Sequence, residues 1–386
     1  MTASGEPVNS KSQNSVGGGS LLAYQEIISL ENLFAAWQEF IRGKRNKPDV
    51  QKFSVNLIDN ILQLHEELVN KTYKHGGYEQ FNISDPKPRQ ISKASVRDRL
   101  VHHAVYWILY PFFDKTFIYD SYSCRVDKGT HRAIRRFRAM FLEVSNYNRK
   151  TCWVLKLDIK KFFANIDHDI LLGILKEYIP DMDILWLLEE IIGSFGSEAA
   201  SSLSIPEART WPRNRGSIPR SPLNSTDIPS GDGKRAGVGL PLGNLTSQLL
   251  VNIYMNQFDQ FMKHELKVRY YIRYADDFVI LSHSRPELIN QRATILSFLK
   301  DKLRLDLHPD KIILKIFASG IDFLGWVNFP NRRILRTTTK KRMLKKFNEN
   351  NTQSYLGLLK HGNTHKLCQE LINLSWLLGS QKNAKL

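Results

Sequence analysis

The sequence predicts an α+β fold, because helical and strand-like hydrophobic patterns follow one another along the chain. Its 386 residues are 42% hydrophobic, which is enough for a large core in one extended domain or in two to three subdomains. Apolar residues recur at three- and four-residue spacing in several stretches, as amphipathic helices require. The stretches 270–274 and 278–281 are instead rich in β-forming residues and enclose Ala275, Asp276 and Asp277, which predicts an antiparallel hairpin with acids at its tip.

The first part of the chain begins with a polar segment, 1–20, that ends in three glycines and a serine. We expect it to be a flexible leader. In the stretch 78–92 apolar and polar residues alternate, and the stretch contains Pro86 and Pro88. This pattern predicts a strand pair or an extended loop. The helices predicted from hydrophobic spacing in this part cover 33–41, 57–68 and 96–113.

The second part opens with a strand-like run, 153–158, that ends in an acid. Residues 196–236 hold five prolines and many serines, which predicts a long surface insertion. A β-like piece covers 312–327. The segment 331–386 has 12 lysines and arginines against two acids, a net charge of +10, with apolar residues at helical spacing. The helices predicted here cover 170–178, 184–192, 246–266 and 288–303.

The formal net charge of +17 predicts attraction to a polyanion, most simply nucleic acid. Membrane lipid is the competing polyanion. However, the chain has no run of 18 apolar residues and no signal-peptide core, so we expect a cytoplasmic protein with no membrane partner. The three cysteines are not spaced as a C-x-x-C pair, which argues against a structural zinc site.

Asp158, Asp276 and Asp277 are the candidates for metal chemistry. Adjacent carboxylates at a turn between apolar strands repel one another in a low dielectric, and a cation offsets that cost. A strand ending in Asp158 beside the hairpin would form a cluster able to hold two Mg²⁺ ions about 4 Å apart, with Mn²⁺ as a chemically possible substitute. Asp167 and Asp169 are alternative ligands, although a helix cap is the simpler interpretation of both.

The order and spacing of several motifs resemble bacterial reverse transcriptases related to group II intron enzymes, over about residues 30–345. Tyr274 to Asp277 is similar to the family's Y-x-D-D box, and Asp158 to Asp167 resembles its first metal-binding motif. The other matching segments are 97–101, 123–133, 239–248, 308–311 and 323–326. Seven motifs in the same order make the resemblance specific.

The resemblance implies a right-hand polymerase with an antiparallel palm sheet. Fingers would span 21–150, the palm 151–330 with the insertion 196–236, and a basic helical thumb 331–386. The implied reaction is the copying of template RNA into cDNA from deoxynucleoside triphosphates, by two-metal nucleotidyl transfer that releases pyrophosphate. The RNA/cDNA duplex would then lie against the basic C-terminal segment.

Position within these motifs implies a role for individual residues. Asp158, Ile159, Asp276 and Asp277 would hold metal. Phe163 would be an aromatic gate that excludes a 2′-hydroxyl, with core packing as its alternative. The other residues implied at the nucleotide are Arg89, Lys87, Phe162, Leu242, Gly243, Gln248 and Lys311, and those implied at primer or template are Tyr274, Gly325, Trp326, Lys340, Lys341, Arg342 and Lys345.

Simpler alternatives remain open for several of these residues. Arg89 and Lys87 would also fit as surface charges of a loop. Lys311, which would screen or protonate the leaving pyrophosphate, would also fit as a solvated lysine. Gly325, which would allow close approach of the primer end, would also fit as a turn glycine. The basic residues 340–346 would also fit as a solvated helix face.

The nucleotide-pocket motif departs from the family pattern Q-G-x-x-x-S-P, because Leu242 replaces the glutamine and Gln248 the proline. This variant resembles the reverse transcriptases of diversity-generating retroelements, which copy RNA with errors at adenines and work with a small basic accessory protein. An antiphage-defence or orphan bacterial reverse transcriptase is one alternative. A non-catalytic RNA-binding protein on a polymerase fold is another, and the presence of all three aspartates argues against it.

Overall fold

The computed structural model describes residues 22–84, 88–201 and 237–383. The expected leader 1–20, Lys87 and most of the expected insertion therefore lie outside the described residues. Helix α8 (Met182–Ser201) continues into the stretch that was expected to break at residue 196. Within the described ranges, no helix is both long enough and apolar enough to cross a membrane.

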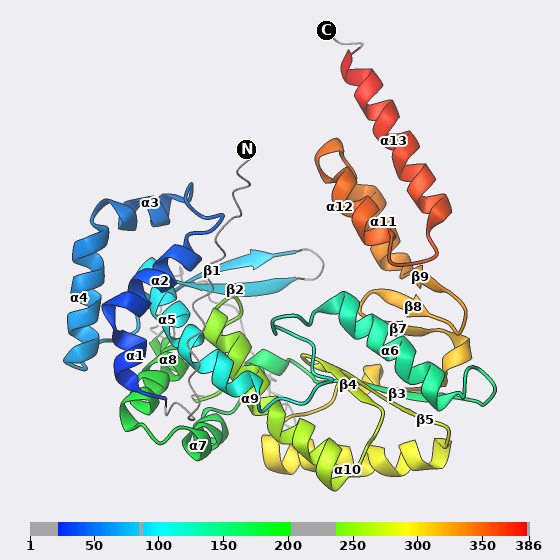
Figure 1. The fold of residues 1–386 in the computed structure, drawn as a ribbon, viewed down its shortest axis with the longest axis horizontal. Helices are drawn as coiled ribbons and strands as arrows, with labels where there is room; N and C mark the ends of the chain where they lie inside the picture. Colours follow the sequence, from blue (N-terminus) through cyan, green and yellow to red (C-terminus); the bar gives the residue numbers. More distant parts are fainter. Residues whose placement is uncertain (1–21, 85–87, 202–236, 384–386) are drawn as a thin grey trace, which may run out of the picture.

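Helices dominate the N-terminal part. Ser29 and Ser95 cap α2 and α5 by accepting hydrogen bonds from the N–H groups of Asn32 and Asp98, which satisfies otherwise unpaired helix-start donors. The stretch 78–92 forms an antiparallel hairpin, which projects from these helices in Figure 1. The elements here are α1 (Tyr24–Ile28), α2 (Leu30–Phe40), α3 (Pro48–Val55), α4 (Leu57–Val69), β1 (Tyr78–Ile83), β2 (Arg89–Ala94) and α5 (Val96–Asp114).

A four-stranded antiparallel sheet of order β4-β5-β3-β6 forms the centre of the molecule. The predicted hairpin at 270–281 is confirmed as β4 (Tyr271–Tyr274) and β5 (Asp277–Ser282). The other two strands are β3 (Trp153–Asp158) and β6 (Ile313–Ile316). Alternate residues of β3 face opposite sides of the sheet, so Val154 and Leu155 enter different hydrophobic clusters.

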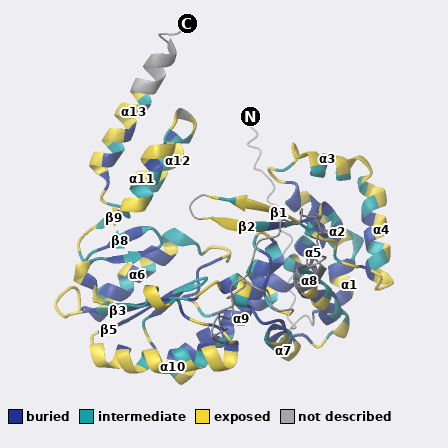
Figure 2. Cartoon of the chain, turned by 180° about the vertical axis from the view of Figure 1, so that it is seen from behind, coloured by how far each residue is buried: buried dark blue, intermediate teal, exposed yellow. Residues whose placement is uncertain are grey.

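Helices cover both faces of this sheet, which confirms the α+β class. Helix α6 (Thr130–Val144) packs on the face that includes Val154, while α9 (Leu245–Gln260) and α10 (Arg285–Leu303) pack on the other. In Figure 2, α5 and α9 are mostly buried, whereas α10 exposes its outer side. Helix α7 (His168–Tyr178) packs beside α9, and α9 continues into a short π-helical turn, η2 (Phe261–Glu265).

The C-terminal part adds a three-stranded sheet and, among the described residues, three α-helices. The stretch 312–327, expected as one β-like piece, is divided between two sheets, because the turn η4 (Phe317–Ser319) and Gly320, at φ +85°, redirect the chain. In Figure 1 the last three helices stand at the end away from α1–α5. The elements are β7 (Ile321–Phe323), β8 (Trp326–Asn328), β9 (Arg333–Leu335), α11 (Thr337–Lys346), α12 (Thr352–Leu359) and α13 (His365–Asn383).

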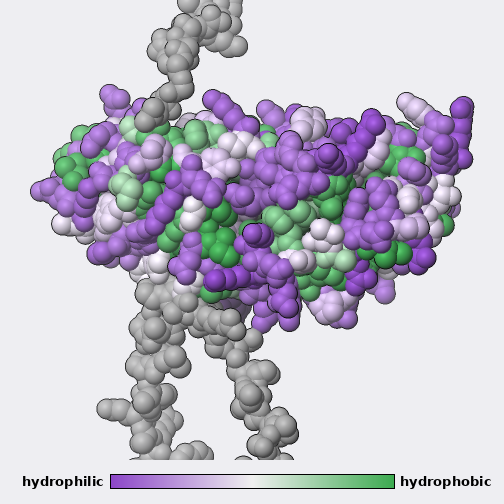
Figure 3. Space-filling model, turned by 90° about the horizontal axis from the view of Figure 1, so that it is seen from below, coloured by the Kyte–Doolittle hydropathy of each residue, from purple (hydrophilic) through white to green (hydrophobic). Residues whose placement is uncertain are grey.

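Strand β9 lies beyond residue 330, the expected end of the palm, and pairs with β8. This sheet therefore continues into the segment that the sequence pattern marked as helical. The molecule's underside, seen in Figure 3, is mostly hydrophilic with smaller hydrophobic patches, as expected of side chains that face water.

Candidate active site

The three predicted aspartates lie at one end of the four-stranded sheet. Asp158 is the last residue of β3 and Asp277 the first of β5, and they are directly opposite in the antiparallel register. Opposite Cα atoms in such a pair are about 4.5–5.5 Å apart and their side chains share a face. Asp276 lies in the two-residue turn between β4 and β5, and its carbonyl accepts a hydrogen bond from the Ile159 N–H at 3.1 Å.

Two lysines neutralise two of these carboxylates. Lys311 Nζ, in the 3₁₀ turn η3 (Pro309–Lys311), donates to Asp158 Oδ1 at 2.5 Å. Lys156 Nζ lies 2.9 Å from Asp277 Oδ2 and also donates to the Asp322 carbonyl at 2.9 Å. Lys156 is two residues before Asp158, so it shares that residue's face of β3 and reaches Asp277 diagonally across the strands.

Burial and mutual repulsion disfavour the charged forms of the acids in the hairpin. Burial, reinforced by the charge of Asp158, raises the pKa of Asp276. Burial raises the pKa of Asp277 to about 6, although Lys156 opposes that rise. Asp277 Oδ1 is buried and has no hydrogen-bond partner in the part of the chain that the structure describes. Such an unsatisfied oxygen is costly, and a cation would satisfy it.

The acids fit a divalent cation by their chemistry, although their side chains do not surround one as they stand. Among residues 22–84, 88–201 and 237–383, no three His, Cys, Asp or Glu side chains form a metal-binding group. Asp158 and Asp277 are each paired with a lysine instead. Ile159 is buried in the core, so it would contribute to a metal site only through its backbone carbonyl. Hard carboxylate oxygens, one of them unsatisfied, are the donors that Mg²⁺ prefers.

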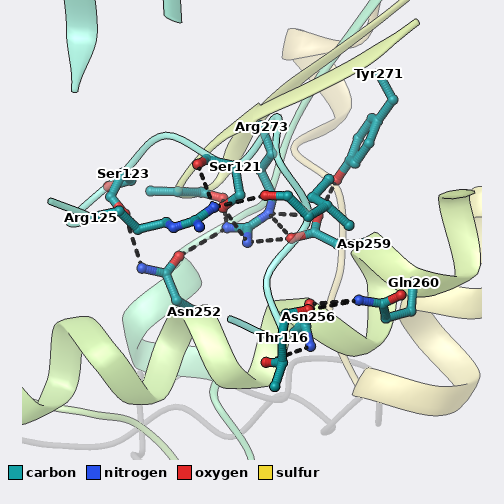
Figure 4. A network of polar contacts seen from close by, with 12 residues as sticks. Thr116, Ser121, Ser123, Arg125, Asn252, Asn256, Asp259, Gln260, Tyr271 and Arg273 are labelled. Atoms are coloured by element: carbon teal, nitrogen blue, oxygen red, sulfur yellow. Dashed lines mark hydrogen bonds and ion pairs between the residues drawn. The ribbon is translucent and has the colours of Figure 1, made fainter. Parts of the chain in front are cut away.

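A buried arginine holds the hairpin turn in place (Figure 4). Ala275 has φ +54°, a left-handed conformation that is unfavourable for a residue with a Cβ atom. Arg273 Nη1 donates to the Ala275 carbonyl at 3.2 Å, and its Nε and Nη2 donate to the Asp259 carboxylate at 2.8 and 2.6 Å. Ser121 Oγ accepts a further bond at 3.0 Å, and Asp259 also accepts one from the Tyr271 hydroxyl at 2.7 Å.

This network joins three parts of the chain that are far apart in sequence. Asp259 is on α9, Arg273 on β4, and Ser121 precedes α6. Both side chains of the Arg273–Asp259 pair are fully buried. The buried Arg273–Asp259 ion pair therefore holds the turn that contains Asp276 and precedes Asp277 in one conformation.

Three of the expected nucleotide-contacting residues, Arg89, Leu242 and Gly243, lie on two neighbouring segments. Arg89 is an exposed residue at the start of β2, and its charge opposes the rise that burial causes in the pKa of Asp276. The Leu242 carbonyl accepts from the Ser92 N–H at 3.1 Å, which joins the loop before α9 to β2. Gly243, at φ +117°, packs so close to β2 that an added Cβ would lie 3.0 Å from Ile91.

Phe163 and Gln248 are half-buried, on the turn η1 (Phe162–Asn165) and on α9 respectively. The backbone holds Phe163 beside the loop before α9, because its carbonyl accepts from the Leu240 N–H at 2.8 Å. Asp167, the alternative metal ligand, accepts from the Ile170 N–H at 3.1 Å, so the simpler interpretation of a cap on α7 is confirmed for it.

Two expected contact residues are buried instead. Phe162 is part of the main core and only 4% exposed, so its ring is enclosed by other side chains, whereas Phe163 is half-buried and packs against the same core. Trp326 is 1% exposed, and its ring lies against Gly362, where an added Cβ would be 2.2 Å from it. Its large aromatic ring fills the core of the C-terminal part, so no exposed part of the side chain could contact a primer.

The remaining primer and template candidates lie at the end of β4, in the turn between β7 and β8, and on α11. Gly325, at φ +86°, and Leu324 form the two-residue turn between β7 and β8, and the Tyr274 hydroxyl accepts from Thr130 at 3.2 Å. Lys340 Nζ is 3.8 Å from Glu370 on α13. Lys341 and Lys345 are exposed, whereas Arg342 is half-buried.

Sequence reasoning missed the groups that support the acids, namely Lys156, Arg273 and Asp259. The available signal was a charged residue inside an apolar strand: Lys156 interrupts 153–158 and Arg273 interrupts 270–274. A buried charge needs a partner, so each of these residues indicates a nearby acid without identifying it.

Residues 74–328 match the family model described as "Reverse transcriptase (RNA-dependent DNA polymerase)". The chain is 24% identical to Protein YkfC of Escherichia coli (strain K12), over 63% of this chain and 63% of that protein. It is 21% identical to the group II intron-encoded protein LtrA of Lactococcus lactis subsp. cremoris, over 87% of this chain and 61% of that protein. The chain thus spans less than two thirds of these curated relatives. A structure of telomerase from Candida albicans with a fragment of telomeric RNA matches 69% of this chain and 46% of its own, at 13% identity and a TM-score of 0.44.

Proposed function

The chain belongs to the reverse transcriptase family, and on that premise we propose that it is an active RNA-directed DNA polymerase. One observation carries the proposal: the register that sets Asp158 opposite Asp277, with Asp276 in the adjoining turn. The substrates would be template RNA, a primer and deoxynucleoside triphosphates. We assign fingers to about 21–150, the palm to 151–330 and the thumb to 331–386.

Asp158, Asp276, Asp277 and the Ile159 carbonyl would hold two Mg²⁺ ions, for which Mn²⁺ would be a substitute. Bound divalent ions supply Lewis-acid stabilisation of phosphoryl and hydroxyl oxygens. Lys156 and Lys311 neutralise the acids of the free enzyme. Lys311 would then be available to screen the leaving pyrophosphate.

The surrounding residues would position and select the nucleotide. Arg89 would bind the triphosphate, because its charge already acts on the acid cluster. The ring of Phe163 would exclude a 2′-hydroxyl beside the segment at Leu242 and Gly243. Phosphoryl transfer depends mostly on such positioning and on charge neutralisation.

Primer extension on a defined RNA template tests the proposal. Asp276→Asn and Asp277→Asn should each lower the extension rate by more than ~100-fold, because each removes a donor from the proposed metal site. Asp59→Asn, an identical change on α4, is the matched control and should extend normally. Asp276→Asn and Asp277→Asn proteins that extend like the parent would show that the acids are not catalytic. A folded parent that binds RNA but never extends a primer would favour a non-catalytic RNA-binding protein.

We further propose that copying is error-prone, within a diversity-generating retroelement that also supplies a small basic accessory protein. The supporting observation is the apolar side chain of Leu242 in the loop before α9. The carbonyl of Leu242 accepts a hydrogen bond from the Ser92 N–H on β2, which attaches this loop to the strand. A site without a polar group there would check base pairing less strictly. Sequencing of cDNA should show frequent errors opposite adenines, fewer errors for Leu242→Gln, and no change for Ile58→Gln on α4. Uniformly accurate copying by the parent would favour the antiphage-defence or orphan alternative.

A further inference from the structure

A basic and aromatic pocket lies beside the catalytic hairpin, between residues 119–128 and the first turns of α6. Its volume is about 580 Å³, and its lining includes Tyr119, Tyr122, Lys128, Arg132, Arg135 and Arg136. None of these residues belongs to the metal, nucleotide or primer sets discussed above.

The pocket carries more positive charge than its acids neutralise. Arg132 lies 3.4 Å from Asp127, and Arg136 Nε donates to Asp120 at 2.9 Å. Arg135 is exposed and has no acid or hydrogen-bond partner among the described residues. Burial, together with the charge of nearby Arg125, lowers the pKa of Lys128, as expected where cations crowd. An anion would relieve this repulsion.

The pocket also exposes an aromatic side chain. Tyr119 is 70% exposed, and the Lys128 ammonium lies 3.7 Å from its ring centroid. Lys128 Nζ also donates to the Tyr119 carbonyl at 2.8 Å, so the backbone holds the cation in place. Cations that alternate with exposed rings in a concave surface are typical of sites for single-stranded nucleic acid, because phosphates pair with the cations and bases stack on the rings.

The pocket wall is hydrogen-bonded directly to β4, the strand that precedes the turn of the acids. The Arg273 N–H donates to the Asp120 carbonyl at 3.0 Å, and the Tyr122 N–H donates to the Arg273 carbonyl at 3.0 Å. Arg273 lies on β4, which is followed by the turn containing Asp276 and then by Asp277, the first residue of β5. The pocket wall is thus attached to β4, the strand that leads directly into the turn containing Asp276.

We propose that this pocket binds a single-stranded nucleotide segment, with a phosphate between Lys128 and Arg135 and a base against Tyr119. The inference rests on the proposed polymerase function, which supplies unpaired template RNA and, once the RNA/cDNA duplex is separated, single-stranded cDNA. The pocket would hold the strand outside the site of chemistry and so keep the enzyme on its template.

The test is fluorescence anisotropy with a labelled octamer of uridylate and, in a second arm, of thymidylate. Full-length protein is used in EDTA without nucleotides, so catalysis plays no part. Arg135→Glu should weaken binding about tenfold and reduce the salt dependence by about one counterion. Tyr119→Ala should weaken binding at least fivefold, within the range for loss of one stacked base. The oligonucleotide that binds with higher affinity identifies whether the pocket takes RNA or DNA.

Matched controls make the same changes elsewhere. Arg292→Glu is on exposed α10, and Tyr147→Ala removes a similarly exposed ring after α6. Both should bind within about twofold of the parent, and Arg135→Gln should lie between Arg135→Glu and the parent, as expected for a charge effect. The pocket is refuted if Arg135→Glu and Tyr119→Ala bind like these controls, or if inorganic triphosphate displaces the oligonucleotide at micromolar concentration. A parent that binds but never extends a primer would refute the polymerase proposal and leave the pocket intact.

Discussion

Replacing Arg273 with methionine should remove about 3–5 kcal/mol from the free energy of unfolding, which is the typical cost of breaking a buried ion pair. Both Arg273 and Asp259 have fully buried side chains, so water cannot replace the lost partner. In the variant, the Asp259 carboxylate would keep the Tyr271 hydroxyl but lose the bonds that it now accepts from the guanidinium at 2.6–3.1 Å. The methionine side chain fills much of the volume, so cavity formation adds little.

Arg273→Lys should cost less, about 1–3 kcal/mol, because an ammonium keeps the charge but cannot reach Asp259, Ser121 and the Ala275 carbonyl together. If Arg273 positions the turn of the proposed catalytic acids, this variant should also extend primers more slowly at saturating nucleotide, at a temperature where it is fully folded. A lower maximal rate with an unchanged KM for nucleotide would indicate misplaced acids, which a loss of folded protein alone would not produce.

The assay is urea denaturation followed by circular dichroism, together with primer extension. The double variant Arg273→Met/Asp259→Leu removes both charges and should regain most of the stability lost by Arg273→Met. The reasoning fails if Arg273→Met unfolds within about 1 kcal/mol of the parent, a range typical of ordinary substitutions. It also fails if the double variant is no more stable than Arg273→Met.

Three further outcomes follow from the described contacts. Burial and nearby cations lower the pKa of His103 from 6.5 to about 4, so folded His103 stays neutral where the unfolded chain takes up a proton. Because of this difference, the free energy of unfolding should be about 3 kcal/mol higher above pH 6.5 than near pH 4. His103→Leu should flatten this part of the pH–stability curve measured with urea. Mg²⁺ should raise the melting temperature at pH 7 in the parent but not in Asp277→Asn, because binding to the folded state stabilises it. Gly362→Ala should destabilise by about 1–3 kcal/mol, since its Cβ would lie 2.2 Å from the Trp326 ring, whereas Gly357→Ala, with open space around it, should be neutral or stabilising in the same thermal melts.

Each of these outcomes has a contrary result. If the pH–stability curve of His103→Leu runs parallel to that of the parent, the His103 ring does not titrate as described. An equal Mg²⁺ shift in Asp277→Asn would place cation binding elsewhere. Equal melting temperatures for the two glycine variants would show that the ring of Trp326 moves aside at little cost.

The sequence alone predicted several of the elements and the convergence of the three acids at one end of a sheet. A hydrophobic period of two or of three to four residues is a local property, so the hairpin at 270–281 and the helix at 288–303 could be recognised from spacing. A strand ending in Asp158 and a turn holding Asp276 and Asp277 can meet only at a sheet end, which made their convergence predictable. The cap formed by Asp167 followed from its place before a helical pattern.

Only the tertiary structure decided which partners these residues have. Lys156 and Arg273 were visible as charges within apolar strands, but their acids, Asp277 and Asp259, were chosen by the register of the sheet and by the packing of α9. Trp326 matched a primer motif in sequence, yet the fold of the C-terminal helices buries it. The physical reason is the same in each case: periodicity specifies which face a side chain occupies, whereas burial and ion pairing depend on segments brought together from distant parts of the chain.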